Sequence, residues 1–524
     1  QAVLAQAVPL RSAPKPPMKR RPAACPSLLR KPAHLQRKPA ELPREPAALQ
    51  VSPLLSEGFT FQHKFSHDNP GRLEDFYELN SKQLGEGAFG HVYKAKSKST
   101  SAVRAVKGIQ IQSVKNPLRL EQEISIAKQL DHPNVVRLYE TFRDAQKMYL
   151  VMELCTGGEL FDRIIDERRF DETKAAIYIR QILAALCYLH SKRLAHRDVK
   201  PENFLLQNSS PDASLKIIDF GLACWYEPGQ RMRTKSGTAY YVAPEVLGDD
   251  GYDEKCDVWS AGVVSFIILS GYPPFAGDND PVIMQKVKRG KFEFGSPAWD
   301  NISAGAKGLI TQMLTKQFKD RPAAGVLLEH PWLSHKEASS VAVPVSAKFV
   351  ERLQAFRAHC KFKKVALTVV AQQLADHKIE DLRATFQALD QNCDGMLSPD
   401  EIRAGLGKAG LNVPEALEDV LRCVDSDGSG QLDYTEFLAA TIDKRLYLRR
   451  DVCWCAFRKF DLDGDGKITR EELHQVLSAS EVQQTMDSAH IEQMIKEADT
   501  DGDGCVDFDE FCAMMEPAKK KARG

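Results

Sequence analysis

The sequence has no net charge, since 71 lysines and arginines balance 71 aspartates and glutamates among its 524 residues. A chain without an overall charge has no general electrostatic attraction to nucleic acid or to a membrane surface. No apolar run approaches the roughly 20 residues that a membrane-spanning helix needs. The longest, at residues 261–269, predicts a buried core helix instead. We therefore expect no nucleic-acid partner and no transmembrane segment.

The Cys-x-x-Cys spacing and a secretory segment are missing as well. The 12 cysteines include no Cys-x-x-Cys pair, and no apolar stretch of the secretory type opens the chain. This combination is typical of reduced intracellular proteins. We expect a cytoplasmic monomer, with nuclear or membrane-associated pools left open.

The balanced charge hides an uneven distribution along the chain. Residues 1–50 carry ten basic and two acidic residues, whereas residues 381–516 carry 13 basic and 30 acidic ones. Residues 1–70 mix proline, alanine, lysine and arginine without sustained periodicity, which predicts a disordered basic extension. This extension is either a solvated linker or an attachment to an acidic surface or an SH3-type partner.

The full length of the chain predicts three or four folded units. The residues after the basic extension divide into segments with different patterns of apolar and polar residues. Strand-like segments such as 148–152 come first, and longer helical stretches such as 173–190 follow. This order predicts a small β-rich lobe and then a larger helical lobe. The predicted parts are a two-lobed domain at 76–333, a basic amphipathic junction at 334–380, an acidic repeat region at 381–516 and a basic tail at 517–524.

A glycine-rich segment has the pattern G-x-G-x-x-G-x-V, in which positions without side chains let backbone amides approach phosphate oxygens. Its defined positions are Gly85, Gly87, Gly90 and Val92. A plain hairpin or a dinucleotide fold would also suit this pattern. However, a dinucleotide fold needs a helix directly afterwards, and residues 92–95 continue as a strand. Lys107 follows on a strand, and Glu123 on a helix can pair with it, so that Lys107 would hold the α- and β-phosphates.

The segment at 196–203 is a sharper signal, because it places a carboxylate, a lysine and an amide at fixed offsets in one loop. Phosphoryl transfer from ATP needs a base that orients the attacking hydroxyl, a divalent metal ion and cations along the phosphate oxygens. Asp198 suits the base and Lys200 the stabilising cation. Asn203 and Asp219 suit Mg²⁺ ligands.

Residues 76–333 resemble the eukaryotic protein kinases, through these motifs and through A-P-E at 243–245 and D-V-W-S-A-G at 257–262. The resemblance implies a two-lobed α+β fold, an ion pair between Glu245 and Arg321, and Met152 as gatekeeper. The nucleotide-binding residues that it implies are Leu84, Gly85, Gly87, Gly90, Val92, Ala105, Lys107, Glu123, Glu153, Cys155 and Leu205.

Glu159 lies in the segment G-G-E-L-F-D, which resembles the calmodulin-dependent kinase group. In basophilic kinases this position meets an arginine three residues before the phosphorylated serine or threonine. A cleft carboxylate is a strong specificity device, because a neutral substrate residue leaves it unpaired. The alternative interpretation is a glutamate that caps a surface helix.

An acidic motif recurs four times with starts 35, 36 and 38 residues apart, at 390–401, 425–436, 461–472 and 499–510. Each copy fits D-x-[DN]-x-[DNS]-G with glutamate at position 12, a loop that wraps calcium in oxygen ligands. The side-chain ligand candidates are Asp390, Asn392, Asp394, Ser398 and Glu401; Asp425, Asp427, Ser429, Asp433 and Glu436; Asp461, Asp463, Asp465, Thr469 and Glu472; and Asp499, Asp501, Asp503, Asp507 and Glu510. Position 7 offers a backbone carbonyl, from Met396, Gln431, Lys467 and Cys505.

Two further features of the loops carry predictions. Position 8 is apolar in every copy, as Leu397, Leu432, Ile468 and Val506, which suits a short β-contact between paired hands. The fourth loop carries five carboxylates at ligand positions and the first carries three. Higher ligand charge favours tighter binding, so we expect the second pair of hands to fill first.

The junction has an apolar face with a basic rim. Phe349, Leu353, Phe356 and Cys360 fall on one helical face, and Lys363 and other basic residues surround it. This pattern suits a helix in the apolar groove of a calcium-loaded pair of hands. A helix that packs on the kinase lobe is the alternative.

A kinase, a basic junction and four calcium hands in this order resemble the calcium-dependent protein kinases of plants, algae and protists, over about residues 76–516. The resemblance implies that the junction blocks the catalytic cleft at low calcium and that calcium binding withdraws it. ATP, Mg²⁺ and Ca²⁺ are the implied cofactors. The alternatives are a calcium-sensing scaffold with little transferase activity and a kinase that answers to external calmodulin.

The activation segment departs from the family. Thr234 lies three residues before Gly237, where many members carry an acidic residue, and Arg197 is well placed to meet a negative charge there. Phosphorylation of the threonine would supply that charge. Because Arg231 and Arg233 stand three residues before Thr234 and Ser236, we expect autophosphorylation at one of these two sites, with Thr234 favoured.

Overall fold

Alternation of apolar and polar residues in the first folded segment produces the strands of a six-stranded sheet. The computed structural model describes residues 67–69, 71–87, 90–114, 116–333, 347–357, 359–374, 379–414, 417–425, 428–479 and 488–516. The predicted tail and most of the predicted basic extension lie outside these residues. The described chain has the predicted α+β class.

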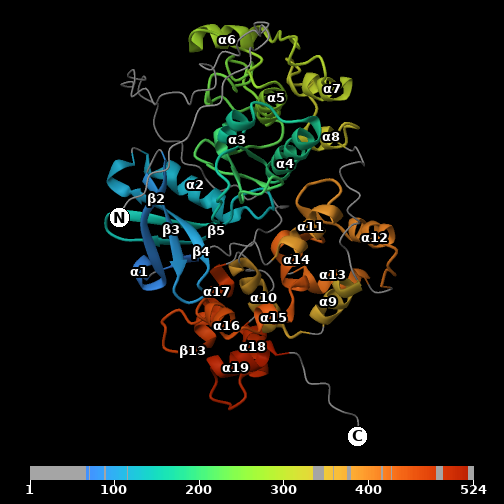
Figure 1. The fold of residues 1–524 in the computed structure, drawn as a ribbon. Helices are drawn as coiled ribbons and strands as arrows, with labels where there is room; N and C mark the ends of the chain where they lie inside the picture. The colour runs from blue at the N-terminus through green and yellow to red at the C-terminus, as the bar shows by residue number, and fades with distance from the viewer. Residues whose placement is uncertain are drawn as a thin grey trace, which may run out of the picture. The chain divides into compact units, whose positions relative to one another are not determined.

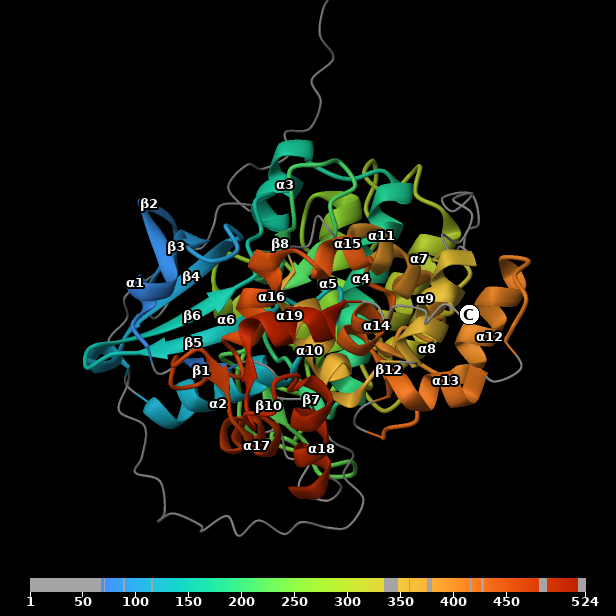
Figure 2. The same ribbon diagram turned by 90° about the horizontal axis from the view of Figure 1, so that it is seen from below.

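The N-terminal lobe holds the sheet and one long helix, α2. Its elements are β1 (His67–Asn69), α1 (Leu73–Phe76), β2 (Tyr77–Gly87), β3 (Gly90–Ser97), β4 (Val103–Gln110), the 3-10 turn η2 (Ile111–Ser113), α2 (Pro117–Gln129), β5 (Leu138–Arg143) and β6 (Lys147–Met152). The strand order is β1-β5-β6-β4-β3-β2, and Figures 1 and 2 show the strands side by side. Helix α2 begins where the Asn116 side chain accepts a hydrogen bond from the Arg119 amide, with proline next in the chain.

Strand β1 differs from the sequence prediction, which extended the disordered segment to residue 70. Residues His67–Asn69 pair in parallel with Glu140–Phe142 of β5. Asp68 accepts hydrogen bonds from Lys128 and Thr141, which fix the strand at the sheet edge. Tertiary pairing therefore orders a segment whose own composition does not favour a strand.

The C-terminal lobe is mainly helical, as predicted. Its elements are α3 (Leu160–Glu167), α4 (Glu172–Ser191), β7 (Leu194–Ala195), η3 (Pro201–Asn203), β8 (Phe204–Leu206), β9 (Leu215–Ile217), β10 (Cys224–Trp225), α5 (Lys255–Ser270), α6 (Asp280–Arg289), α7 (Ala304–Met313) and α8 (Ala324–Leu328). Helix α5 is buried from Cys256 to Ser270, which confirms the predicted core helix. It ends at Gly271, whose φ of 79° and close approach to the Arg168 carbonyl require glycine.

The acidic repeats form helix–loop–helix units. Their elements are α11 (Glu380–Leu389), β11 (Met396–Leu397), α12 (Pro399–Lys408), α13 (Leu417–Val424), β12 (Leu432–Asp433), α14 (Tyr434–Thr441), α15 (Lys444–Tyr447), α16 (Arg450–Phe457), β13 (Lys467–Ile468), α17 (Arg470–Ala479), α18 (Ser488–Ala498), β14 (Val506–Asp507) and α19 (Phe508–Met515). Strand β11 pairs with β12 and β13 with β14, opposing the apolar residues of position 8. The predicted inter-loop contact is confirmed.

The junction forms two helices, α9 (Ala347–Arg357) and α10 (Lys361–Gln373), where the sequence pattern suggested one continuous apolar face. The break falls before Cys360, which has an extended backbone and precedes the first residue of α10. Phe349, Leu353 and Phe362 are buried in the same apolar cluster as the helices of the hands.

The prediction that Lys363 lies on a basic rim around the apolar face of the junction is wrong. Lys363 is only 3% exposed, and its ammonium donates to the carbonyls of Met515 and Glu516 at the end of α19. Those carbonyls have no partner within their own helix, and a cation satisfies them well.

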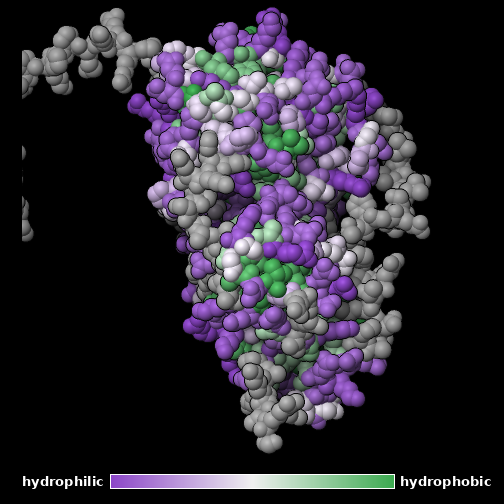
Figure 3. All heavy atoms as spheres, turned by 90° about the vertical axis from the view of Figure 1, so that its right-hand side faces the viewer, coloured by the Kyte–Doolittle hydropathy of each residue, from purple (hydrophilic) through white to green (hydrophobic). Residues whose placement is uncertain are grey.

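Among the described helices, none has the length and apolarity that a membrane crossing would require. On the face shown in Figure 3, hydrophilic residues predominate, and hydrophobic residues gather in separate areas between them.

Candidate functional site

The sheet register assembles the upper wall of the candidate nucleotide site. Gly85 on β2 lies opposite Val92 on β3, and Val92 lies opposite Lys107 on β4. The Lys107 ammonium is 3.2 Å from a carboxylate oxygen of Glu123 on α2, and both side chains are largely buried. The pair that the sequence predicted is formed, which places the cation beneath the glycine-rich strands.

The segment after β6 forms the inner edge of the same site. Ala105 on β4 lies opposite Met152 on β6, and Glu153 follows directly. The Glu153 side chain is buried and its carboxylate lies 2.8 Å from the Lys216 ammonium, so that only its backbone is suited to a ligand. Cys155 comes two residues later and is partly buried. Leu205 lies on β8, and Leu84 on β2 is half exposed.

The catalytic-loop candidates converge on the Asp198 carboxylate. Its Oδ2 accepts hydrogen bonds from the Lys200 ammonium at 2.5 Å and from the Asn203 amide at 3.2 Å, and its Oδ1 accepts one from the Thr238 hydroxyl at 3.0 Å. Sequence reasoning missed Thr238, because it lies 40 residues away in the activation segment. The structure thus brings Asp198, Lys200 and Asn203 together as predicted.

Asp257 holds the backbone of the catalytic loop at His196 and Arg197 in place, a role that sequence analysis did not assign. Its fully buried carboxylate accepts hydrogen bonds from the backbone amides of His196 and Arg197 and contacts the His190 ring at 3.0 Å. These donors lower the pKa of Asp257 although burial alone would raise it. Arg197 has a φ of 64°, a left-handed conformation that this anchored turn imposes.

Two oxygen-bearing side chains are available for a metal ion. Asn203 uses its amide nitrogen to hold the Asp198 carbonyl, which leaves its oxygen for another partner. Asp219 also has a φ of 64° and accepts a hydrogen bond from the Gly221 amide. The next residue, Phe220, is buried with its ring 5.4 Å from that of His196. Amide and carboxylate oxygens suit a hard divalent cation, so the side chains of Asn203 and Asp219 fit a divalent metal ion.

Glu159 precedes the first turn of α3 and its carboxylate has a second acidic neighbour that sequence analysis missed. The pKa of Glu202 is raised, mainly because the side chain is buried. The negative charges of Glu159 and Asp198 also raise this pKa, and the positive charge of Lys200 opposes them. Two nearby carboxylates at the edge of the catalytic loop repel each other, so a cation placed beside them would be stabilised. The signal was present in the sequence, since Glu202 lies within the motif at 196–203.

The activation segment places Thr234 at the surface. Its backbone carbonyl accepts a hydrogen bond from the Tyr252 hydroxyl, which itself accepts one from Arg197 at 3.2 Å. Arg197 thus reaches this segment through Tyr252 and the Thr234 backbone. Ser236 is partly buried, so Thr234 is the more accessible of the two candidates.

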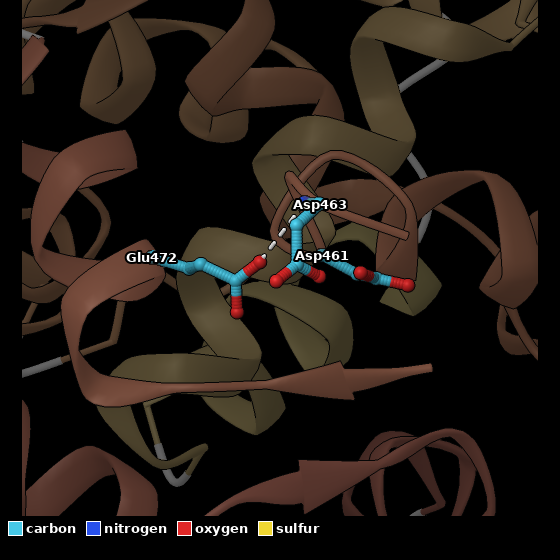
Figure 4. Close-up of side chains that lie close together, drawn as sticks. All are labelled: Asp461, Asp463 and Glu472. Carbon is cyan, nitrogen blue, oxygen red and sulfur yellow. Dashed lines mark hydrogen bonds between the residues drawn. The ribbon is translucent and has the colours of Figure 1, made fainter. Parts of the chain in front are cut away.

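Two of the acidic loops already gather carboxylates as a cation would require. Oxygens of Asp461, Asp463 and Glu472 lie within 4.8 Å of one another, as do those of Asp499, Asp501 and Asp503. Figure 4 shows the three side chains of the first group next to one another. Both groups belong to the second pair of hands, and their all-oxygen donor set fits calcium.

The first pair of hands differs in detail. In the first loop, burial and the nearby charge of Asp394 together raise the pKa of Asp390 to about 8. Glu401 accepts hydrogen bonds from the Gln391 and Asn392 amides, which draws the end of the loop to its start. In the second loop, the Asp425 carboxylate accepts a hydrogen bond from the Gly430 amide, and the Glu436 side chain is buried. Asp427 lies outside the described residues.

Comparison with known proteins identifies both halves of this arrangement. The sequence model of the protein kinase domain matches residues 78–333, and that of the EF-hand domain pair matches residues 379–442 and 450–516. Calcium-dependent protein kinase 3 of Plasmodium berghei is 44% identical over 466 residues, which cover 88% of this chain and 84% of the relative. The chain belongs to the calcium-dependent protein kinases.

Other members of the family have similar identity. Calcium-dependent protein kinase 5 of Plasmodium falciparum is 42% identical over 86% of this chain and 80% of its own length. Calcium-dependent protein kinase 21 of Arabidopsis thaliana is 40% identical over 86% and 85%. The chain is therefore a serine/threonine protein kinase that uses ATP and a divalent metal ion and carries calcium-binding EF-hands.

The predicted brace of the large lobe is also present in this calcium-dependent protein kinase. Arg321 is fully buried and makes two hydrogen bonds to the Glu245 carboxylate, at 2.6 and 3.1 Å. A planar guanidinium matches a carboxylate in this two-point geometry. The ion pair implied by the family resemblance is confirmed.

Proposed function

We propose that calcium binding to the EF-hands of this chain switches on phosphorylation of basophilic protein substrates. The observation that carries the proposal is a kinase cleft with its Lys107–Glu123 pair formed, in the same structure as two carboxylate clusters suited to calcium. Asp198 orients the substrate hydroxyl and accepts its proton. Lys200 stabilises charge on the transferred phosphate.

The nucleotide is held from above by the glycine-rich strands and Lys107, while the segment at Glu153 and Cys155 meets the adenine. Asn203 and Asp219 hold Mg²⁺, which when bound neutralises charge on the phosphates. Thr238 and Lys200 fix the Asp198 carboxylate so that it is already oriented when the hydroxyl arrives. Preorganised groups of this kind need no rearrangement during transfer.

Calcium acts through the junction. At low calcium the junction helices leave the hands and cover the catalytic cleft, and at high calcium the opened hands withdraw them. Support comes from α9 and α10, whose apolar side chains share one buried cluster with the helices of the hands. A calcium ion shifts this equilibrium only through a difference in affinity between the two states.

Peptide phosphorylation with and without calcium tests the proposal. We expect activity to rise steeply with calcium in the purified full chain and to be unchanged by added calmodulin at saturating calcium. Activity that ignores calcium would contradict the regulatory part and leave the transferase. A calmodulin requirement would contradict control by the chain's own hands.

Substrate preference gives a specific prediction for Glu159→Gln. Because a charged partner is lost from a partly buried site, kcat/KM for a peptide with arginine three residues before serine should fall about 30-fold. A peptide with glutamine at that position should be affected little. Asp166→Asn, an exposed change on the same helix, is the matched control. Equal losses for both peptides would contradict a specificity role.

Thr234 gives a second prediction, for autophosphorylation. After incubation with MgATP and calcium, mass spectrometry should find phosphate at Thr234 in preference to Ser236. Thr234→Ala should lower activity about threefold, and Thr234→Asp should retain most of it, since the added negative charge lies near Arg197. Unchanged activity in both variants, without phosphate at either site, would overturn the proposal.

A further inference from the structure

We propose that Glu140 and Lys459 are positioning residues, whose ion pair couples calcium binding in the third hand to the kinase helix that carries Glu123. Glu140 lies on β5 of the kinase domain, and Lys459 lies two residues before Asp461, the first residue of the third loop. The inference rests on the proposed calcium activation and adds the contact through which one hand acts.

Glu140 is a buried carboxylate on which three segments converge. Its Oε2 accepts hydrogen bonds from the Lys459 ammonium at 3.0 Å and from the Asn69 amide at 3.1 Å, and its Oε1 accepts one from the Tyr77 hydroxyl. The Glu140 side chain is 6% exposed and that of Lys459 18%. Asn69 and Tyr77 are neutral, so Lys459 is the charged donor among these three. Loss of the cation would leave a buried charge poorly compensated.

The same short stretch of the third hand makes two further contacts with the kinase domain. The Arg458 guanidinium lies 5.0 Å from the centre of the Phe76 ring, and the Cys455 thiol contacts the Ser99 hydroxyl at 3.0 Å. Phe460, the residue after Lys459, is buried against Phe362 of the junction. The position of Lys459 is therefore tied to the junction as well as to the calcium loop.

On the kinase side, Glu140 connects to the Lys107–Glu123 pair through short contacts. Asn69, which donates to Glu140, belongs to β1, and its neighbour Asp68 accepts a hydrogen bond from Lys128 at 2.6 Å. Lys128 lies in the last turn of α2, and Glu123 on the same helix pairs with Lys107. Ordering β1 against β5 therefore helps to hold α2 in the position that the Lys107–Glu123 pair requires.

The third loop and this contact are assembled together. The carboxylates of Asp461, Asp463 and Glu472 lie close enough to share a cation in the same structure in which Lys459 meets Glu140. Calcium ligation by Asp461 fixes the backbone two residues after Lys459 and so favours the ion pair. By reciprocity, the formed ion pair favours calcium in the third loop.

Lys459→Met in the full chain tests the coupling, since methionine keeps the apolar stem and removes the charge. We expect the calcium concentration for half-maximal peptide phosphorylation to rise about fivefold or more, with the calcium-free rate unchanged. Lys459→Arg should retain the wild-type response. Arg450→Met, on α16, is the matched control, because Arg450 is exposed and pairs with Asp509 within the hands.

A double-mutant cycle decides whether Lys459 acts through Glu140. If it does, Glu140→Gln combined with Lys459→Met should be no more impaired than the worse single variant. Hydrogen exchange supplies a readout that does not depend on catalysis. Calcium should protect the amides of residues 71–76 and of α2 in the wild-type chain and should protect them much less in Lys459→Met.

Four results would overturn the proposal: a wild-type calcium response in Lys459→Met, independent effects that multiply in the double variant, an Arg variant as impaired as the Met variant, or equal calcium protection in both chains. A wild-type chain whose activity ignored calcium would instead contradict the proposed function, while the exchange experiment would still report on the contact.

Discussion

Asp198→Asn should reduce peptide phosphorylation by the purified chain about 10³-fold, within the range for loss of a positioned acid–base group. Asparagine has nearly the same shape, but it cannot accept the proton of the substrate hydroxyl. Its amide group would also turn a donor toward Lys200 or Thr238, where Asp198 now accepts hydrogen bonds from both. Single-turnover phosphorylation at saturating MgATP measures the effect.

The controls for this variant separate catalysis from folding. Asp212→Asn makes the same chemical change at an exposed residue of the same lobe and should retain full activity. ATP binding to Asp198→Asn, measured by calorimetry, should be unchanged, because Asp198 is not among the residues assigned to the nucleotide. Full phosphorylation by this variant would contradict the assigned role of Asp198, and an inactive wild-type chain would favour the calcium-sensing scaffold instead.

Glu472→Gln and Glu510→Gln should each raise the calcium concentration for half-maximal activity about tenfold or more, because ligand charge sets the affinity of such loops. Glu472 already holds its loop together through four hydrogen bonds. Its Oε1 accepts hydrogen bonds from the backbone amides of Leu462 and Asp463, and its Oε2 accepts them from the amide and the hydroxyl of Thr469. Glutamine removes one of these acceptors and the negative charge.

Glu471→Gln and Asp509→Asn are the matched controls, since each makes the equivalent change one residue away from the ligand. Both should leave the calcium response unchanged. The affinity for ATP should also be unaffected in all four variants. An unshifted calcium midpoint in both Glu472→Gln and Glu510→Gln would contradict the assignment of the loops.

The sequence predicted the site residues where the chemistry is confined to short segments. Asp198, Lys200 and Asn203 meet because they share one loop, and the paired apolar residues Leu397 and Leu432 meet because the hands repeat. In such segments the spacing along the chain sets the spacing in space.

The sequence did not predict contacts that join distant segments. Thr238 and Asp257 reach the catalytic loop from 40 and about 60 residues away, and the break before Cys360 separates the junction into two helices. A local pattern cannot reveal these features, because they depend on which surfaces meet after the chain has folded.

Lys363 and Lys459 show the same limit for charge. The sequence placed Lys363 on the basic rim of the junction and assigned no role to Lys459. The tertiary structure buries Lys363 at the end of α19 and turns Lys459 onto Glu140. The sequence by itself determined the family, the cleft chemistry and the calcium loops, since these lie in local motifs. Only the tertiary structure decided where the charged residues between the motifs lie, because burial and a distant partner change what a charge contributes.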